Sequence, residues 1–225
     1  MSESSVSVSR AYPASDRKPT PYERLTQAIM SGELPAGQPL VETALAEWCQ
    51  VSRTPIREAL TRLEQDGLVV RGERGLMVRE RSPEEILDIY ETRIVLEAMA
   101  ARVAATRRSY LDIMALRRIA QRLEDLDITD ELAMAEGNRE FHRAVRRASH
   151  NESLSDLLQR LDLHVARYPS TTLSQPGRWD EANREHRGII DAIEKQDPEL
   201  AHQRTAEHFT HARELRLALW AQGRE

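Results

Sequence analysis

Several features are scarce or missing in this sequence of 225 residues, and each absence excludes a class of protein. The single cysteine, Cys49, excludes an internal disulfide framework and a cysteine-based zinc finger, so a reducing compartment suits the chain. No apolar run approaches the roughly 20 residues of a membrane-spanning helix, and the N-terminal residues lack the apolar middle of a signal peptide. We therefore expect a cytoplasmic protein with no membrane partner.

Positive charge is not in excess either. The chain has 32 lysines and arginines against 37 acidic residues, a net charge of -5, which excludes an overall basic coat for nucleic acid. Hydrophobic residues make up 40% and charged residues 31%, which is typical of an ordinary folded protein rather than a disordered chain.

Proline and glycine are nearly absent from the middle of the chain. Residues 84–168 contain no proline and one glycine, Gly137, and their apolar residues recur at helical spacing. Residues 1–19 are rich in serine and poor in large apolar groups, which predicts a disordered tail. We expect a folded N-terminal unit over 20–79, a linker over 80–82 and an all-helical domain over 83–222.

Helix starts are marked by a capping side chain followed by proline. The pairs are Thr20-Pro21, Thr54-Pro55, Ser82-Pro83 and Asp197-Pro198. The first and third continue as capping boxes, with a glutamate three residues after the cap. We predict helices over about 20–31, 42–49, 54–66, 82–107 (continuous or broken in two), 109–126, 130–149, 151–168, 176–195 and 198–222.

One β element interrupts the helices. Residues 68–71 and 76–79 are short extended runs on either side of a turn bounded by Gly72 and Gly75, which predicts a single hairpin. We find no strand pattern after Ser82. The sequence therefore predicts a mainly α protein, in which a small α/β unit precedes a bundle of six or seven helices.

Residues 40–67 predict a short helix, a tight turn and a second helix. On the second helix Ile56, Leu60 and Leu63 form a core-facing stripe, and the opposite side carries Arg57 and Thr61.

A helix that enters the major groove of DNA needs long hydrogen-bond donors on its exposed N-terminal part, and Arg53 and Arg57 lie there. Arg71 and Arg74 lie near the tip of the hairpin, where a wing could contact the DNA backbone or the minor groove. The alternative is a surface helix with scattered arginines. The combination of helix, turn, helix and hairpin favours a winged helix-turn-helix that binds DNA.

Three of the seven histidines lie on apolar helix faces. His186 and His208 are each surrounded by apolar residues at helical spacing, and Asn138 and His142 lie four residues apart at the edge of another apolar stripe. A metal ion satisfies several buried imidazoles at once, whereas a hydrogen-bonded core histidine is the ordinary alternative. The pattern alone leaves both interpretations open.

The N-terminal unit resembles the winged helix of GntR-type transcription regulators over the run from Tyr22 to Val78. The matching motifs are Leu45-Ala46-Glu47, Val51-Ser52-Arg53-Thr54-Pro55-Ile56-Arg57-Glu58-Ala59-Leu60, Leu63-Glu64 and Asp66-Gly67-Leu68, with Gly32 and Gly37 around Pro35. The resemblance implies a homodimer that binds double-stranded DNA at a short inverted repeat.

The same resemblance assigns individual roles. It implies that Arg53 and Arg57 read bases, that Ser52 and Thr54 hold phosphates, and that Gly75 lies near the wing tip. Thr43 departs from relatives that carry a DNA-contacting arginine at that position.

The helical domain, from about 84 to 220, resembles the FCD effector domain of the FadR branch, in which a carboxylate and three histidines hold a metal beneath a ligand cavity. The matching positions are Asn138, His142, His186 and His208. Zinc is the first expectation for the metal, with nickel or manganese as alternatives. Because Asn138 replaces the usual aspartate, a bound Zn²⁺ would keep its full charge and favour an anionic effector. Loss of the metal is the competing outcome, since an amide binds a cation more weakly than a carboxylate does.

Arg93 and Glu97 match a further local pattern of that family. There the arginine is placed to meet the carboxylate of an effector, which a guanidinium can bind through two hydrogen bonds. The alternative is an ordinary i,i+4 Arg–Glu pair on a helix surface.

These observations favour a dimeric regulator whose helical domain senses a small organic acid, with a bound metal, and thereby controls operator binding. One alternative is a metal-free regulator that senses a larger ligand such as an acyl-CoA. Another is a metal-dependent enzyme, but the sequence contains no H-E-x-x-H, G-x-S-x-G or phosphate-binding glycine loop, and we expect no catalysis.

Overall fold

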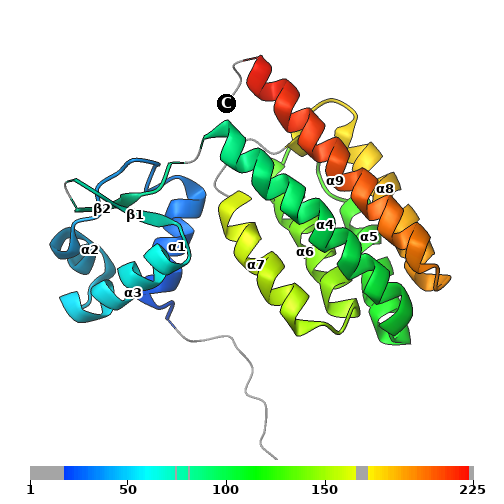
Figure 1. Ribbon diagram of the computed structural model, residues 1–225, viewed down its shortest axis with the longest axis horizontal. Helices are drawn as coiled ribbons and strands as arrows, with labels where there is room; N and C mark the ends of the chain where they lie inside the picture. Colours follow the sequence, from blue (N-terminus) through cyan, green and yellow to red (C-terminus); the bar gives the residue numbers. More distant parts are fainter. Residues whose placement is uncertain (1–17, 74, 81, 166–171, 223–225) are drawn as a thin grey trace, which may run out of the picture.

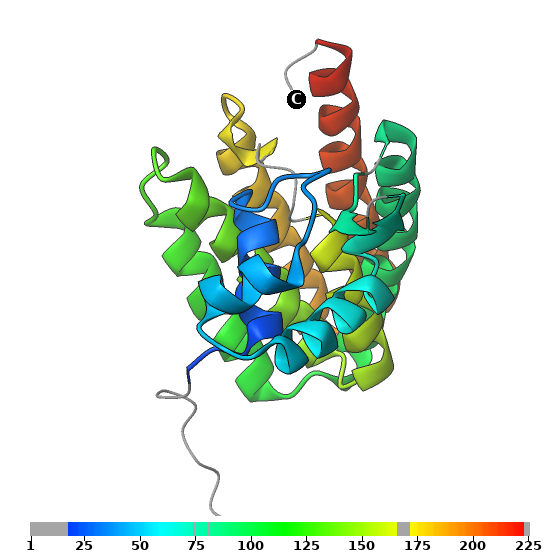
Figure 2. The same cartoon turned by 90° about the vertical axis from the view of Figure 1, so that its left-hand side faces the viewer.

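The computed structural model describes residues 18–73, 75–80, 82–165 and 172–222, and these form an N-terminal unit beside a helical bundle (Figure 1). Seen from the side, the N-terminal unit lies in front of the bundle (Figure 2). The predicted tail over 1–19 falls almost wholly outside the described residues. The N-terminal unit consists of α1 (Pro21–Ser31), α2 (Glu42–Cys49), α3 (Arg53–Gln65), β1 (Val69–Gly72) and β2 (Gly75–Val78).

The bundle has six α-helices within the described residues, as the sequence predicts. The segment after Ser82 forms one continuous helix of 25 residues. The elements are α4 (Pro83–Arg107), α5 (Tyr110–Glu124), α6 (Glu131–Ala148), α7 (Glu152–Val165), the short 3₁₀ helix η1 (Thr172–Ser174), α8 (Arg178–Glu194) and α9 (Pro198–Ala221). None of the helices in the described part of the chain combines the length and apolar character that a membrane crossing needs.

The capping residues explain where most helices begin. Thr20 and Ser82 form the two predicted capping boxes, in which each glutamate accepts a hydrogen bond from the backbone N–H of the cap. The prediction for Thr54 is wrong, because α3 begins at Arg53 with Ser52 as its N-cap. Proline fits anywhere in the first turn, where the backbone N–H groups have no intrahelical partner, so Pro55 does not fix the first residue of the helix.

The hairpin is more extensively paired than the sequence suggests. Val69 pairs with Val78, and Gly72 pairs with Gly75. The segment before α2 also joins this sheet, since the N–H of Leu40 donates to the carbonyl oxygen of Leu76 at 2.8 Å and Pro39 forms a bridge with Met77. The hairpin is therefore anchored to the chain that enters the helix-turn-helix.

Each of the two units has its own hydrophobic core. The N-terminal core includes Leu25, Cys49, Ile56, Leu60, Leu63, Leu68 and Val78. The bundle core includes Leu116, Leu123, Phe141, Ile189 and Ile193. A Cβ on the buried Gly137 would overlap the side chain of Leu123, so this glycine allows α6 to pack closely against α5.

Contacts at Arg79 and Leu163 join the described parts of the two units. The guanidinium of Arg79, just after the hairpin, pairs with Glu85 in the first turn of α4. Leu163, near the end of α7, packs against the N-terminal core. Figure 1 shows α7 as the bundle helix that lies beside the N-terminal unit.

Candidate nucleic-acid interface and metal centre

The exposed face of α3 carries the predicted DNA-reading residues. The side chains of Arg53 and Arg57 are 56% and 62% exposed, and Thr61 is exposed on the same helix. Ser52 and Thr54 are exposed at its start, and Ser52 makes no side-chain capping bond in the described structure. The first turn of α3 therefore offers free backbone N–H groups, a hydroxyl and a guanidinium to an anionic backbone.

Glu42, at the start of α2, holds both arginines. Its Oε2 accepts hydrogen bonds from Arg53 Nη2 at 3.1 Å and from Arg57 Nε at 2.8 Å. These bonds, first that from Arg53 and then that from Arg57, lower the pKa of Glu42. No local sequence pattern marks Glu42, because its partners lie 11 and 15 positions away, across the turn.

We expect Glu42→Gln to raise the affinity for non-specific DNA several-fold, because one negative charge beside the phosphates is removed and the two arginines are no longer held. Fluorescence anisotropy with unrelated duplex DNA measures this affinity. Glu47→Gln is the matched control, because Glu47 is an exposed glutamate of the same helix. An equal rise in both variants would show that only net charge matters.

The hairpin provides the predicted wing. Arg71 is 68% exposed on its side chain and lies 3.7 Å from Glu64. Gly75 has a φ of +113°, a conformation that favours glycine, and open space surrounds the position of its missing Cβ. Arg74 lies outside the described residues.

The three inward histidines meet inside the bundle. α6 contributes His142, α8 contributes His186 and α9 contributes His208, and all three are buried. The Nε2 atoms of His142 and His208 are 3.1 Å apart, and one ring nitrogen from each histidine lies within 4.8 Å of the others. The remaining histidines among the described residues are half-buried or exposed.

The environment keeps these imidazoles neutral. Burial, and then the charges of His208 and His186, hold the pKa of His142 well below its usual value. Burial and then the charge of His208 do the same for His186. Burial also lowers the pKa of His208, against the opposing effect of Glu185. Neutral imidazole nitrogens are the form that binds a metal.

Glu185 orients His208 from the far side. Its Oε2 lies 2.7 Å from His208 Nδ1 and accepts a hydrogen bond from Arg178 at 2.8 Å. Partial burial raises the pKa of Glu185, but the hydrogen bonds from His208 and Arg178 outweigh it and hold this pKa far below its usual value. A carboxylate on Nδ1 leaves the Nε2 lone pair of His208 facing the cluster, an arrangement common around metal ligands.

Unpartnered polar atoms show that these residues fit a metal. Within the described part of the chain, neither ring nitrogen of the fully buried His186 has a hydrogen-bond partner, and the buried Oδ1 of Asn138 has none either. Buried polar groups are normally hydrogen-bonded, so these atoms call for a ligand. His142, His186 and His208, with Asn138 one turn before His142 on α6, are residues that could hold a metal ion through nitrogen and oxygen atoms.

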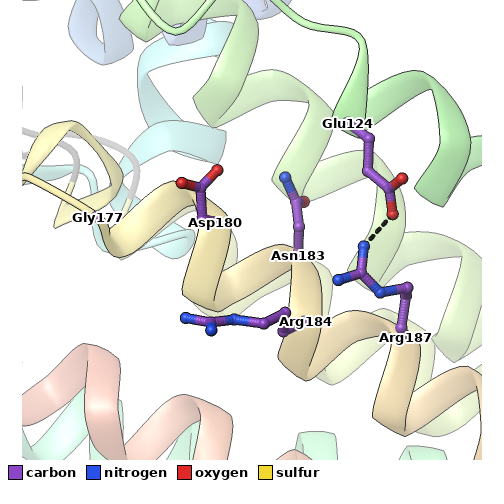
Figure 3. Close-up of a pocket in the computed structure, with 6 residues that line it drawn as sticks. All are labelled: Glu124, Gly177, Asp180, Asn183, Arg184 and Arg187. Atoms are coloured by element: carbon purple, nitrogen blue, oxygen red, sulfur yellow. Dashed lines mark hydrogen bonds and ion pairs between the residues drawn. The ribbon is translucent and has the colours of Figure 1, made fainter.

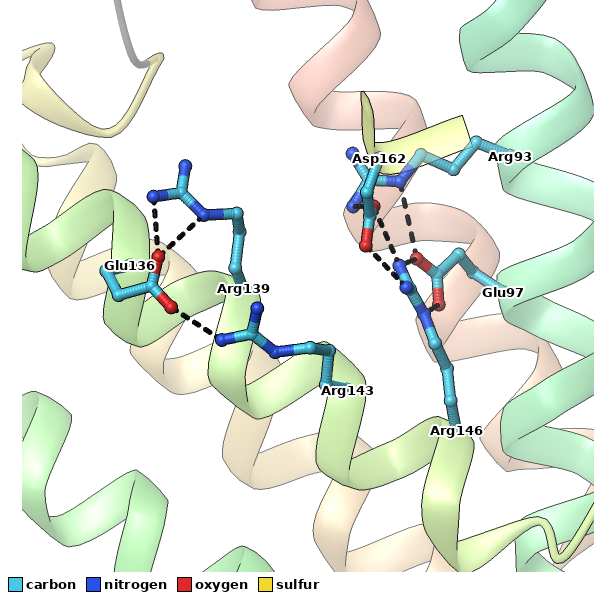
Figure 4. Close-up of polar contacts among 7 residues, drawn as sticks. All are labelled: Arg93, Glu97, Glu136, Arg139, Arg143, Arg146 and Asp162. Atoms are coloured by element: carbon cyan, nitrogen blue, oxygen red, sulfur yellow. Dashed lines mark hydrogen bonds and ion pairs between the residues drawn. The ribbon is translucent and has the colours of Figure 1, made fainter. Parts of the chain in front are cut away.

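Arg93 and Glu97 are buried rather than on a surface. Arg93 Nε donates to Glu97 at 3.3 Å, and both side chains belong to a network with Arg146 of α6 and Asp162 of α7 (Figure 4). Arg146 and Asp162 are not among the site residues predicted from the sequence. Arg146 follows Asn138 and His142 at four-residue spacing, which was the available sign that it shares their inward face.

An open depression of about 450 Å³ lies elsewhere, over the end of α5 and the start of α8 (Figure 3). It is lined by polar and charged side chains, among them Asp180, Arg184 and the ion pair between Arg187 and Glu124. None of the predicted site residues lines it.

Comparisons with known proteins find a matching family for each of the two units. Residues 20–77 match the bacterial regulatory proteins of the gntR family, and residues 88–211 match the FCD domain. The uncharacterized HTH-type transcriptional regulator YdhC of Bacillus subtilis (strain 168) is 30% identical over 92% of this chain and 96% of its own length. A probable D-xylose utilization operon transcriptional repressor of Paenarthrobacter nicotinovorans is 31% identical over 82% of this chain and 81% of its own.

A solved structure shares the fold. E. coli McbR/YncC superposes with a TM-score of 0.75 at 22% sequence identity, covering 89% of this chain and 96% of that one. A winged helix-turn-helix attached to a helical bundle of this kind defines a DNA-binding transcription regulator rather than an enzyme. The chain belongs to the GntR family of bacterial transcription regulators and carries an FCD domain.

Proposed function

We propose that this regulator is a cytoplasmic homodimer that binds an inverted-repeat operator and releases or rearranges on it when the FCD domain binds a small carboxylate at a metal centre. The observation that carries the proposal is the cluster of three neutral, buried histidines, in which His186 has no hydrogen-bond partner among the described residues. The buried Arg93 and Arg146 lie near enough for their charges to contribute to the lowered pKa of His142, after burial and the other two histidines.

The metal and the arginines together suit an anionic effector. His142, His186, His208 and Asn138 supply no negative charge, so a bound Zn²⁺ would keep its full charge and attract an anionic ligand as a further coordinating group. Phe209 connects the two groups, because its ring centroid lies 4.6 Å from that of His142 and 4.9 Å from the guanidinium carbon of Arg93. A small organic acid could meet both features.

Surface composition supports a dimer. α4 and the start of α5 expose large apolar side chains at four-residue or shorter spacing, and a contiguous apolar patch on a protein surface marks an interaction site. These residues are Val95, Met99, Tyr110, Leu111 and Met114.

Elemental analysis of untagged protein tests the metal centre. We expect about one zinc, nickel or manganese ion per chain in the wild type, and loss of that ion in His186→Ala, because a ligand is removed from a small set. His150→Ala is the matched control, since the exposed His150 bonds to Asp112 away from the cluster and its loss leaves the metal content unchanged. A wild-type protein without metal would contradict the metal centre and redirect the search to larger, metal-free effectors.

The sensing function is tested in a separate experiment from the metal content. Operator DNA from the region flanking the protein's own gene is titrated with the metal-loaded dimer, with and without a panel of small carboxylates. We expect at least one carboxylate to change operator affinity by about 5- to 150-fold, the usual range of allosteric coupling. Light scattering gives the oligomeric state, and a monomer would contradict the dimeric mode of binding.

A further inference from the structure

The four charged groups of the buried network are not equally enclosed. The side chains of Glu97, Arg146 and Arg93 are 1%, 3% and 9% exposed, whereas that of Asp162 is 19% exposed. Asp162 is also the only member that α7 contributes (Figure 4). Glu97 shares α4 with Arg93 and is enclosed on all sides, so Asp162 is the carboxylate that can leave without opening the core.

Two arginines bind the carboxylate of Asp162 in the way that they would bind the carboxylate of a ligand. Arg146 donates from Nη1 to Oδ2 at 2.6 Å and from Nη2 to Oδ1 at 3.0 Å, and Arg93 Nη2 lies 3.1 Å from Oδ1. A two-pronged contact of this kind is how arginine binds a free carboxylate ligand. The guanidinium charges of Arg93 and Arg146 outweigh the effect of burial and lower the pKa of Asp162, so its carboxylate is ionised.

The residue after Asp162 contacts the DNA-binding unit. Leu163 packs against the hydrophobic core of the winged helix-turn-helix, whereas Asp162 faces α4 and α6. Successive helical residues point about 100° apart, so one turn of α7 contacts both units. A change at Asp162 therefore acts on the segment that touches the DNA-binding unit.

We propose that Asp162 is an internal substitute for the carboxylate of the effector. A bound small carboxylate takes the place of Asp162 on Arg93 and Arg146, and the released end of α7 loosens the contact between Leu163 and the winged helix-turn-helix. The exchange keeps the network neutral, since one carboxylate replaces another and Asp162 moves into water, so no uncompensated charge stays buried. This inference rests on the proposed function, because it specifies how the same sensor responds to its ligand.

Hydrogen–deuterium exchange of α7 in the full-length protein tests the proposal, with acetate as the probe and acetamide as its uncharged control. In Asp162→Asn without any ligand, we expect amides of residues 158–165 to exchange about tenfold faster than in the wild type, because charge-assisted bonds to two arginines are lost. Acetate accelerates the same amides in the wild type and adds nothing in the variant, and acetamide has no effect on either protein.

Asp156→Asn is the matched control. Asp156 is an exposed aspartate of the same helix, and the same substitution there leaves the exchange of α7 at the wild-type level. Leu163→Ala provides the second variant, in which acetate still loosens α7 but operator affinity no longer responds to it.

Different results overturn the role of Asp162 and the sensing function. Exchange of α7 that is the same in Asp162→Asn and wild type overturns the role of Asp162, whatever carboxylates do to operator binding. Acetate that binds, as measured by calorimetry, without accelerating α7 in the wild type overturns it equally. A third result is that no carboxylate changes operator binding while α7 exchanges faster in Asp162→Asn. This result overturns the sensing function but supports the role of Asp162 in stabilising α7.

Discussion

Arg57→Ala is expected to remove most of the discrimination between operator and unrelated DNA while leaving weak, salt-dependent binding. Arg57 is exposed on the N-terminal half of α3, where a recognition helix reaches base edges. An arginine that bonds two acceptors of a guanine contributes about 1–3 kcal/mol of discrimination, or about 5- to 150-fold in relative affinity. Competition titrations of operator against scrambled duplex DNA measure the ratio.

Arg62→Ala is the matched control on the same helix. The guanidinium of Arg62 lies over the ring of Tyr22, with 3.9 Å from its carbon to the ring centroid, so it is engaged within the protein. Its loss removes the same charge and should lower operator and scrambled affinities together. An Arg57→Ala protein that keeps the wild-type ratio would contradict the assignment of α3 as the recognition helix.

Arg146→Met is expected to destabilise the FCD domain by about 3–5 kcal/mol, because a buried ion network that loses one partner keeps uncompensated charge. Burial lowers the pKa of Arg146, but Glu97 and Asp162 outweigh it and raise that pKa above its usual value, so the guanidinium stays charged. Without it, two carboxylates share the single charge of Arg93. Denaturant unfolding of the metal-loaded protein measures the loss.

The same helix provides the comparison for Arg146. Arg143 is 45% exposed and pairs with the exposed Glu136, so Arg143→Met should cost no more than about 1 kcal/mol. The double variant Arg146→Met with Glu97→Met should recover part of the loss, since it removes a buried carboxylate as well. Equal stability of Arg146→Met and Arg143→Met would refute the structural importance of the network.

Sequence alone could predict features that depend on neighbouring residues. The capping boxes at Thr20 and Ser82 are local hydrogen-bond patterns, and both form as predicted. The inward positions of His142, His186 and His208 follow from helical periodicity on three separate helices. Periodicity places each histidine on an apolar face, and packing of the three helices then brings them together.

Features that depend on contacts between distant segments could not be predicted. Sequence spacing suggested that Arg93 and Glu97 either meet a ligand or form a surface pair. Both are buried, which excludes the surface pair, and Arg146 and Asp162 complete their network. Asp162 lies on a different helix, and no local pattern marks it. The added pairing of Pro39 with Met77 is similarly a matter of tertiary arrangement.

The burial of Cys49 allows selective labelling of a cysteine introduced on the surface of this protein. The thiol is buried in the N-terminal core, where burial raises its pKa against the smaller opposing effect of Arg24, and a protonated thiol reacts slowly with alkylating reagents. Because it is the only cysteine of the chain, a second one introduced on α7 or on the wing would be the sole fast-reacting thiol. A spin label or fluorophore could then be attached at that single site, with the native residue left in place, to follow the mobility of α7 or of the wing.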